Sequence, residues 1–393
     1  MWLPESDIEP VTELPELESL KSSASEAELQ SLLSKTAMLK LNGGLGTSMG
    51  LEKAKSLLVV KDGKTFLDLI AEQVKYTRKR YGCNVRFVLM NSFSTSADTK
   101  EYLGREHADL MAEPDVELLQ NASPKVDAAT LKPATYAPAP ELECGLLDRL
   151  LAEGVEYLFV SNSDNLGATL DLDLLRHVAD SGSAFVMEVA RRTASDKKGG
   201  HLARRAADGR LVLRESAQCP DGDKAAFRGR GPAQNKKTVN PRDSSSAPVF
   251  QLETAMGAAI ECFPDAGAVV VPRSRFAPVK TCSDLLVLRS DAYKITPAAT
   301  VELVEPTAPA VKLDDKHYKL VDQMERLVKA VPSLWQAESL TVKGPVVFER
   351  GVVVRGNVVL ENASSEPLAV KSRVLVNTTI DLVAEHEKSD AQA

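Results

Sequence analysis

Short apolar runs alternate with longer amphipathic stretches through the first two thirds of the chain. The apolar runs have the length and composition of buried strands, and the periodicity of residues 65–82 and 94–110 predicts helices between them. Strands alternating with helices predict a parallel sheet with helices on both faces, which binds its ligands at the carboxyl ends of the strands. The expected strands are 38–41, 56–60, 84–92 and 157–160, with a further strand end in 116–126 and a further strand followed by a basic turn in 185–202.

The pattern changes after Tyr293. One helix is expected over 317–331, and from Leu340 onward valine-rich runs are interrupted by Gly344, Gly351 and Gly356. Short apolar strands broken by glycines predict a small stack of β-helix coils. We therefore expect four parts, an N-terminal helical segment, a catalytic domain, a connecting helical segment and a C-terminal β-helix with a charged tail. Their ranges are 1–35, 36–293, 294–331 and 332–393.

A glycine-rich stretch follows the first expected strand. Asn42-Gly43-Gly44 lets the chain take backbone angles that are closed to other residues, and Gly46 to Gly50 adds further glycines with two hydroxyls. Backbone N–H groups in such a loop can hold phosphate oxygens, while Lys53 and Lys55 supply positive charge. The stretch has neither P-loop nor dinucleotide-fold spacing, and a plain strand-to-helix turn is the alternative interpretation.

A second polar stretch, Ser161 to Asn165, follows the strand at 157–160. Asp164 at this place is suited to holding Mg²⁺, which takes one or two carboxylates besides water and substrate phosphates. The alternative is that Asp164 only caps the next helix. Two other strand ends, Asn42 to Gly44 and Asn91-Ser92, are expected to face one crevice.

Composition narrows the class of protein. The chain has 393 residues, 44% of them hydrophobic, and a net charge of −7, which disfavours general nucleic-acid binding. Its five cysteines lie far apart without metal-ligand spacing, so reduced thiols are expected. Neither a membrane-spanning run nor a signal peptide is recognisable, and we expect a cytoplasmic protein. No Ser-His-Asp or Cys-His arrangement suggests a covalent nucleophile.

The text LKLNGGLGTSMG followed by KAKSLL resembles the signature of the UTP–glucose-1-phosphate uridylyltransferases, also called UDP-glucose pyrophosphorylases. This eukaryotic-type family also occurs in some bacteria, and the resemblance covers most of the chain from Trp2 to about Leu382. It implies an α/β fold with a nucleotidyltransferase-type (GT-A-like) doubly wound mixed sheet and a C-terminal left-handed β-helix stack. The implied reaction is reversible, Mg²⁺-dependent transfer of uridylyl from UTP to glucose-1-phosphate, giving UDP-glucose and pyrophosphate.

The resemblance also implies roles for individual residues. Gln120 stands where the family has a glutamine that contacts uracil, whose donor and acceptor edge an amide can pair with. The implied catalytic residues are Lys55 and Lys280, and the implied metal ligand is Asp164. The implied UTP-binding residues are Leu41, Asn42, Gly43, Gly44, Lys55, Gln120 and Lys280. The implied substrate-binding residues are Gly43, Gly44, Asn162, Ser163, Asp164, Gly199, Gly200 and Glu253.

Two blocks of the family are absent, a PPGHGD-type loop before Cys144 and an FNTNNLW-type strand after 223–231. If both are deleted, the chain is a crippled or binding-only homologue. We prefer the interpretation that the sequence omits loop residues, which a Cα–Cα separation well above about 3.8 Å would reveal. A pyrophosphorylase with broader sugar choice is a further alternative. Exposed edge strands of the β-helix also suggest homo-oligomers, while no nucleic acid or membrane partner is expected.

Overall fold

The computed structural model describes residues 3–21, 24–120, 126–130, 132, 145–191, 200–214, 236–238, 248–250 and 256–390. The chain divides into two compact units, and each is described by itself. The first comprises Met1–Ser25, Asn121–Glu143 and Asp171–Arg273, and the second comprises Glu26–Gln120, Cys144–Leu170 and Ser274–Ala393. The junctions at which the two family blocks are absent lie outside the described residues.

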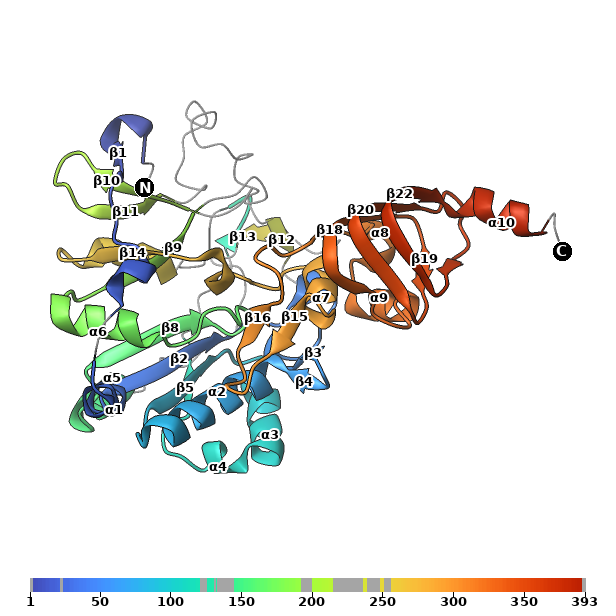
Figure 1. The fold of residues 1–393 in the computed structure, drawn as a ribbon. Coiled ribbons are helices and arrows are strands. Elements are labelled where there is room, and N and C mark those ends of the chain that lie inside the picture. Colours follow the sequence, from blue (N-terminus) through green and yellow to red (C-terminus); the bar gives the residue numbers. More distant parts are fainter. Residues whose placement is uncertain are drawn as a thin grey trace. The chain divides into compact units, whose positions relative to one another are not determined.

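A four-stranded parallel sheet forms the centre of the second unit (Figure 1). Its order is β6-β5-β2-β8, so β2, the first strand of this sheet in the sequence, lies between two later ones. The expected α/β class with parallel pairing is confirmed. The strands are β2 (Thr36–Asn42), β5 (Arg86–Asn91), β6 (Glu117–Leu119) and β8 (Tyr157–Asn162), and the nearby helices are α1 (Glu26–Ser34), α2 (Phe66–Tyr81), α3 (Ser96–Glu106), α4 (Ala108–Met111) and α5 (Leu146–Ala152).

Alternate residues of β2 pack into separate cores, as the two-residue period of a strand requires. Met38 joins a cluster that contains the apolar side chains of α2, while Ala37 and Leu39 join another that contains Leu146 and Leu150 of α5. The sheet is therefore covered on both faces, and only its ends are open to ligands.

The expected strand at 56–60 is wrong in its first half. Residues Lys55–Leu57 form a 3-10 turn, and the strand β3 covers only Val59–Lys61 before a tight hairpin to β4 (Lys64–Thr65). The Lys55 N–H donates to the Gly44 carbonyl at 3.0 Å, which folds this segment back on the glycine loop. That contact between distant residues overrides the local strand pattern.

The C-terminal part of the second unit consists of parallel strands (Figure 1). One sheet has the order β17-β18-β20-β22, and β19 pairs with β21 in another, so successive segments alternate between two sheets. Parallel pairing is confirmed, whereas a left-handed β-helix stays a prediction. The elements are β17 (Ala310–Lys312), β18 (Ser333–Lys343), β19 (Val346–Phe348), β20 (Val352–Glu361), β21 (Leu368–Val370), β22 (Arg373–Asp381) and α10 (Leu382–Asp390).

Two details of this part differ from expectation. The helix expected over 317–331 is two short helices, α8 (Asp315–Tyr318) and α9 (Val321–Leu327), because Leu320 is extended and its side chain covers Gly50.

Gly356 does not end a strand. It lies inside β20 with a φ of 62°, where the register with β22 shifts, as a left-handed glycine at a bulge does. A hairpin, β15 (Tyr293–Ile295) and β16 (Val301–Leu303), and the helix α7 (Cys282–Arg289) precede this part.

The first unit contains small sheets of both kinds. A parallel pair, β9 and β14, packs with α6 around Leu174 and Val269, while β1, β10 and β11 form an antiparallel sheet. Its elements are β1 (Ile8–Pro10), β7 (Val126–Asp127), α6 (Leu172–Ser181), β9 (Val186–Ala190), β10 (His201–Arg205), β11 (Leu211–Arg214), β12 (Lys236–Thr238), β13 (Pro248–Phe250) and β14 (Gly267–Val271). The four proposed domain ranges stay a prediction.

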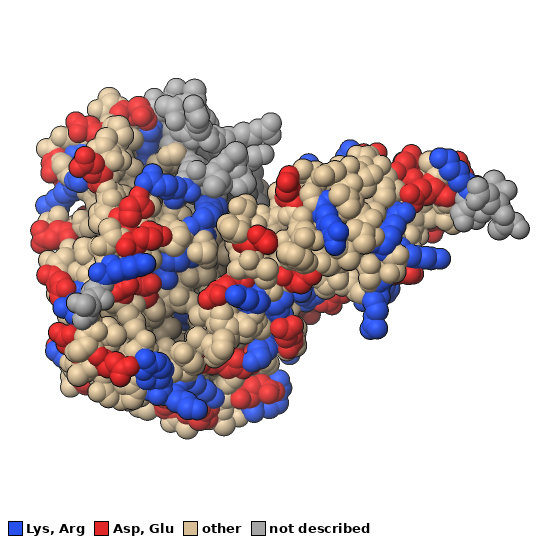
Figure 2. Space-filling model, in the orientation of Figure 1, with Lys and Arg blue, Asp and Glu red and all other residues tan. Residues whose placement is uncertain are grey.

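On the face drawn in Figure 2, charge is not gathered by sign. Acidic and basic side chains are interspersed on the face seen in Figure 2. In the part of the chain that the structure describes, no helix is both long and apolar enough to cross a bilayer. An anionic ligand must therefore be recognised by a few local cations rather than by a general positive field.

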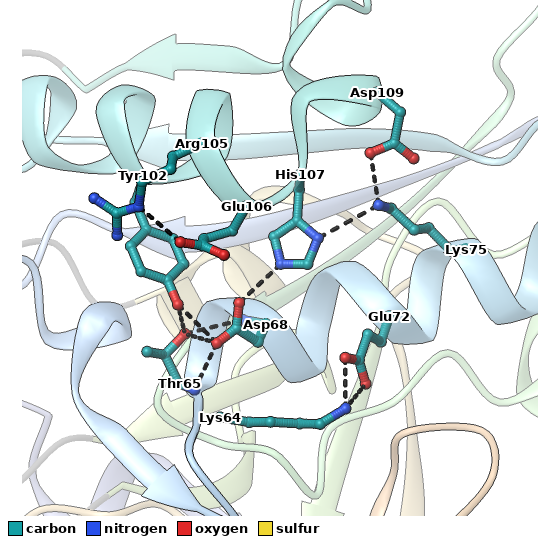
Figure 3. Close-up of polar contacts among 10 residues, drawn as sticks. All are labelled: Lys64, Thr65, Asp68, Glu72, Lys75, Tyr102, Arg105, Glu106, His107 and Asp109. Atoms are coloured by element: carbon teal, nitrogen blue, oxygen red, sulfur yellow. Dashed lines mark hydrogen bonds and ion pairs between the residues drawn. The ribbon is translucent and has the colours of Figure 1, made fainter.

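A cluster of polar side chains, Thr65, Asp68, Tyr102 and His107, fastens α3 and α4 to the start of α2 (Figure 3). The Asp68 carboxylate accepts hydrogen bonds from the Thr65 N–H at 2.8 Å, the Tyr102 hydroxyl at 2.7 Å and His107 Nε2 at 2.8 Å. Lys75 approaches the other ring nitrogen of His107 at 3.4 Å. Burial alone would raise the pKa of Asp68, but these hydrogen bonds outweigh it and hold the pKa below its ordinary value.

Replacement of this carboxylate should change the acid stability of the protein. Because the pKa of Asp68 is lowered by folding, its stabilisation is present above the ordinary carboxyl pKa and is lost as the pH falls through the lowered value. We expect Asp68→Asn to cost about 1–3 kcal/mol at neutral pH and to flatten the loss of stability below about pH 4. Denaturant melts at several pH values measure both effects.

Asp109→Asn is the matched control, because Asp109 is 63% exposed and its ion pair with Lys75 lies at the surface. Its cost should stay below about 1 kcal/mol. Equal losses from both replacements would contradict the role given to the Asp68 cluster.

Candidate active site

A pocket of about 300 Å³ opens at the carboxyl ends of β2, β5 and β8, wholly within the second unit. This is the edge at which the sequence predicted a binding site, and the volume lies at the lower end of ligand pockets. The lining residues are Leu41, Asn42, Gly43, Gly44, Lys55, Ser56, Met90, Gln120, Asn162, Ser163, Asp164 and Lys280.

Two buried asparagines and a partly buried glutamate tie the ends of the strands together. Asn42 Nδ2 donates to Asn91 Oδ1 at 2.7 Å, and Asn91 Nδ2 donates to Glu117 Oε1 at 2.8 Å, linking β2, β5 and β6. Burial alone would raise the pKa of Glu117, but hydrogen bonds from Ser96, Asn91 and Lys100 hold it below its ordinary value. The Asn42 side chain therefore stabilises the carboxyl ends of the strands and points away from the pocket. The backbone of Asn42 is the part that faces a ligand.

Gly43 lies directly beneath the side chain of Gln120. A Cβ atom at Gly43 would come within 2.4 Å of Gln120 Oε1, and the Gln120 N–H is itself held by the Asn91 carbonyl at 2.8 Å. The expectation that Gly43 and Gly44 supply unusual backbone angles is wrong, because the left-handed residues of this loop are Gly46 and Gly50. Gly43 is required instead for the close approach of Gln120, and above Gly44 the space is open.

Lys55 and Asp164 form an ion pair inside the pocket. Lys55 Nζ lies 2.8 Å from Asp164 Oδ2, and the two side chains are only 14% and 24% exposed. Lys55 also donates to the carbonyl of Val279, while the N–H of Val279 donates to the carbonyl of Asp164 at 3.1 Å. The two charges that the sequence assigned to phosphate and metal therefore neutralise each other here, at partial burial where their attraction exceeds that in water.

A second lysine, Lys40 of β2, stabilises the loop that follows β8. Lys40, 1% exposed, donates from Nζ to Ser161 Oγ at 2.7 Å and to the Ala168 carbonyl at 2.9 Å. The ammonium also lies 5.3 Å from the centre of the Phe159 ring. Lys40 thereby joins the two ends of the loop that carries Asp164.

Two hydroxyls in the pocket wall, Ser56 Oγ and Ser163 Oγ, are buried and have no hydrogen-bond partner among the described residues. A buried hydroxyl without a partner is costly, and such groups at a pocket are ready to bind an oxygen-rich ligand. The described residues contain no group of three or more His, Cys, Asp or Glu that could hold a metal alone. With Asp164 as the single carboxylate, the donor set suits Mg²⁺, which completes its octahedron with water and phosphate oxygens.

Most of the predicted site residues come together, but some do not. Gly200 lies just before β10 in the first unit, and Gly199 and Glu253 lie outside the described residues. Lys53 and residues 46–50 do not line the pocket. Residues 47–49 form a 3-10 turn, so the part of the loop that lines the pocket is shorter than its glycine content predicted.

Two lining residues, Met90 and Ser56, were missed from the sequence. Met90 pairs in register with Leu41, so strand alternation places both on the pocket side, whereas the paired Asn42 and Asn91 point the other way. The period of the strand could have identified Met90. Ser56 could not be found in this way, because the 3-10 turn at Lys55–Leu57 has no such signal.

Comparisons with known proteins agree with this geometry. The family model described as UTP–glucose-1-phosphate uridylyltransferase matches residues 2–231 and 230–355. A UTP–glucose-1-phosphate uridylyltransferase of Musa acuminata is 36% identical over 397 residues, spanning 89% of this chain and 83% of the relative. The Saccharomyces cerevisiae enzyme of the same name is 37% identical over 383 residues, spanning 85% and 75%.

Solved structures give the same result at the level of the fold. A Trypanosoma brucei protein described as UDP-glucose phosphorylase superposes with a TM-score of 0.86 at 46% identity, over 97% of this chain and 92% of that one. A mutant UDP-glucose pyrophosphorylase of Leishmania major in complex with UDP-glucose gives 0.86 at 43% identity with the same coverage. The chain therefore belongs to the UTP–glucose-1-phosphate uridylyltransferase family.

Proposed function

We propose that the protein transfers the uridylyl group of UTP to glucose-1-phosphate, releasing pyrophosphate and forming UDP-glucose reversibly. The observation that carries the proposal is the convergence of Gln120, Lys55, Asp164 and Lys280 with the open backbone of Gly44 on one pocket. A base-pairing amide, two cations and a metal-binding carboxylate are what a nucleoside triphosphate requires.

The chemistry needs alignment and charge neutralisation more than proton transfer. A phosphate oxygen of glucose-1-phosphate attacks the α-phosphorus of UTP in line, the bond to the β-phosphate oxygen breaks, and pyrophosphate leaves with that electron pair. The attacking phosphate is already anionic and needs no general base. No covalent intermediate is required, and burial raises the pKa of the Cys282 thiol to about 12, so that this thiol is not a nucleophile at neutral pH.

We assign the residue roles as follows. Gln120 pairs with uracil over Gly43, and Leu41, Asn42, Gly43 and Gly44 hold the nucleotide along the end of β2. Lys55 and Lys280 neutralise the phosphates, and Asn162 and Ser163 contact the ribose or sugar. By resemblance, Gly199, Gly200 and Glu253 contact the glucose.

We further propose that Asp164 holds Mg²⁺ with the substrate phosphates. When bound, the metal supplies positive charge that stabilises the phosphate oxygens during transfer. Asp164 Oδ2 lies 2.8 Å from Lys55 Nζ, so Asp164 would hold the metal beside Lys55, and the positive charges of the metal and of Lys55 would face the same phosphates. Removal of divalent metal with EDTA should abolish turnover, and Mg²⁺ should restore it.

The rate of pyrophosphate release from UTP and glucose-1-phosphate tests the proposed reaction. The same rate measured with galactose-1-phosphate tests whether the enzyme accepts other sugars. One finding bears on the binding-only alternative, and it agrees equally with deletion of the two blocks and with omitted loop residues. The 397 aligned positions of the Musa acuminata relative cover only 89% of this 393-residue chain, so parts of the relative have no counterpart here. Saturable UDP-glucose binding without pyrophosphorolysis, from protein whose intact mass matches the printed sequence, would support that alternative.

Loss of either key charge should remove most turnover. We expect Lys280→Ala and Asp164→Ala each to lower kcat/KM by about 100-fold or more, because each removes charge stabilisation in the transition state. Lys343→Ala is the control, since Lys343 is an exposed lysine paired with Glu361 in the C-terminal sheets. Near-normal pyrophosphate release by either site variant, with an intact fold by circular dichroism, would refute the assignment.

The contact between Gly43 and Gln120 gives a separate prediction. Gly43→Ala introduces a Cβ within 2.4 Å of Gln120 Oε1, so the amide must move from its position. We expect UTP binding measured by calorimetry to weaken at least tenfold. Gly104→Ala is the matched control, because Gly104 lies in α3 outside the pocket and no atom lies within 4 Å of the added Cβ. Unchanged affinity in Gly43→Ala would contradict the uracil role of Gln120.

We also propose a cytoplasmic protein that self-associates through its C-terminal sheets. The strand β22 lies at the edge of its sheet, and its side chains Val374 and Val376 are 54% and 52% exposed. Unpaired edges with apolar side chains favour pairing with another chain. Light scattering at micromolar concentration should report an oligomer that Val376→Lys disrupts, whereas a monomeric wild type would exclude it.

A further inference from the structure

The side-chain amide of Asn165 joins the loop that carries Asp164 to the segment that carries Lys280. Asn165 Oδ1 accepts a hydrogen bond from the Ala277 N–H at 3.0 Å, and its Nδ2 donates to the Arg275 carbonyl at 3.1 Å. Asn165 and Pro278 also form an isolated antiparallel bridge. One amide thus binds a backbone donor and a backbone acceptor two residues apart, as a neighbouring strand would.

The contact extends along both segments. The Val279 N–H donates to the Asp164 carbonyl at 3.1 Å, and Arg275 Nη2 donates to the Thr169 carbonyl at 2.8 Å. Between these points the backbones touch, since a Cβ atom at Gly167 would lie 2.4 Å from the Ser274 carbonyl oxygen. Asn165 lies in the middle of this contact and contributes its only side-chain amide.

Lys280 follows this contact directly. Its N–H donates to Asp284 Oδ2 at 2.9 Å, within the capping box that begins α7 at Thr281. Its backbone is therefore fixed on one side by the helix cap and on the other by the contact through Asn165. The Lys280 side chain itself is exposed and is free to reach a ligand in the pocket.

We propose that Asn165 is a positioning residue that sets the placement of Lys280 relative to Asp164, and so aligns the two charges that act on the phosphates. The inference rests on the proposed function, because it takes those two residues as the phosphate and metal groups. Asn165 need not touch substrate. Misplacement of a catalytic group by about 1 Å can cost roughly 100-fold in rate, so loss of this amide should reduce turnover without removing either charge.

A double-mutant cycle tests the proposal. We expect Asn165→Ala to lower kcat/KM by about 10- to 100-fold, and Asn165→Ala with Lys280→Ala to be hardly worse than Lys280→Ala alone. Residues that act through one another are non-additive, whereas a general loss of stability would multiply with the second loss. Gly167→Ala, which forces apart the same segments, should show the same coupling to Lys280.

Asn362→Ala is the matched control. The Asn362 amide also binds backbone, with Nδ2 donating to the Pro345 and Glu366 carbonyls at 2.7 and 2.8 Å, but it lies in the C-terminal sheets and does not line the pocket. Asn362→Ala should lose about as much stability as Asn165→Ala and keep kcat/KM within about twofold of the wild type. Its effect should be additive with that of Lys280→Ala.

Hydrogen exchange of the peptide spanning 275–281 gives a readout independent of activity. In Asn165→Ala the amides of Ala277 and Val279 should exchange at least tenfold faster, with the rest of the sheet unchanged. If the wild type forms no UDP-glucose, the proposed function fails while exchange still decides whether Asn165 holds this segment. Unchanged exchange, wild-type kcat/KM in Asn165→Ala, or full additivity with Lys280→Ala would each overturn the inference.

Discussion

The ion pair between Lys55 and Asp164 is the interaction on which the geometry of the pocket depends. It joins the segment after the glycine loop to the loop after β8, and through Val279 both are joined to the segment that leads into α7. Three stretches far apart in the sequence meet at this one point. Removal of either partner leaves the other charge partly buried without compensation, so a loss of activity in such variants combines chemistry with local rearrangement.

Around this pair, polar residues hold the ends of the strands in place. Asn91 binds Asn42 on one side and Glu117 on the other, which links β2, β5 and β6. Lys40 donates hydrogen bonds to both ends of the loop that follows β8. Asn42, Asn91 and Lys40 are buried, Glu117 is partly buried, and all four side chains are hydrogen-bonded. Their positions are therefore specific, because an alternative arrangement would leave polar atoms without partners. The exposed residues of the pocket thus rest on a second layer of fixed amides and a buried ammonium group.

Much of this arrangement follows from the sequence. The apolar runs of β2, β5 and β8 and the polar residues that end them predicted the sheet, its parallel pairing and the edge at which a pocket opens. What the pattern could not give depends on contacts between distant residues. Glycine is needed at position 43 because the Gln120 side chain lies against it. The 3-10 turn at Lys55 forms because the Lys55 N–H binds the Gly44 carbonyl. The helix is interrupted at Leu320 because this side chain packs over Gly50. Met90 is the exception, because strand period alone places it beside Leu41.

The central claim is that a pocket of aligned charges, without a nucleophile of its own, catalyses a single displacement at phosphorus. The stereochemical course of the reaction tests this most directly. UTP with a chiral α-thiophosphate should give the thio analogue of UDP-glucose, with sulfur retained on the transferred phosphorus and the configuration there inverted, since one in-line attack inverts the centre. Retention of configuration would require two displacements through a covalent enzyme intermediate and would contradict the account.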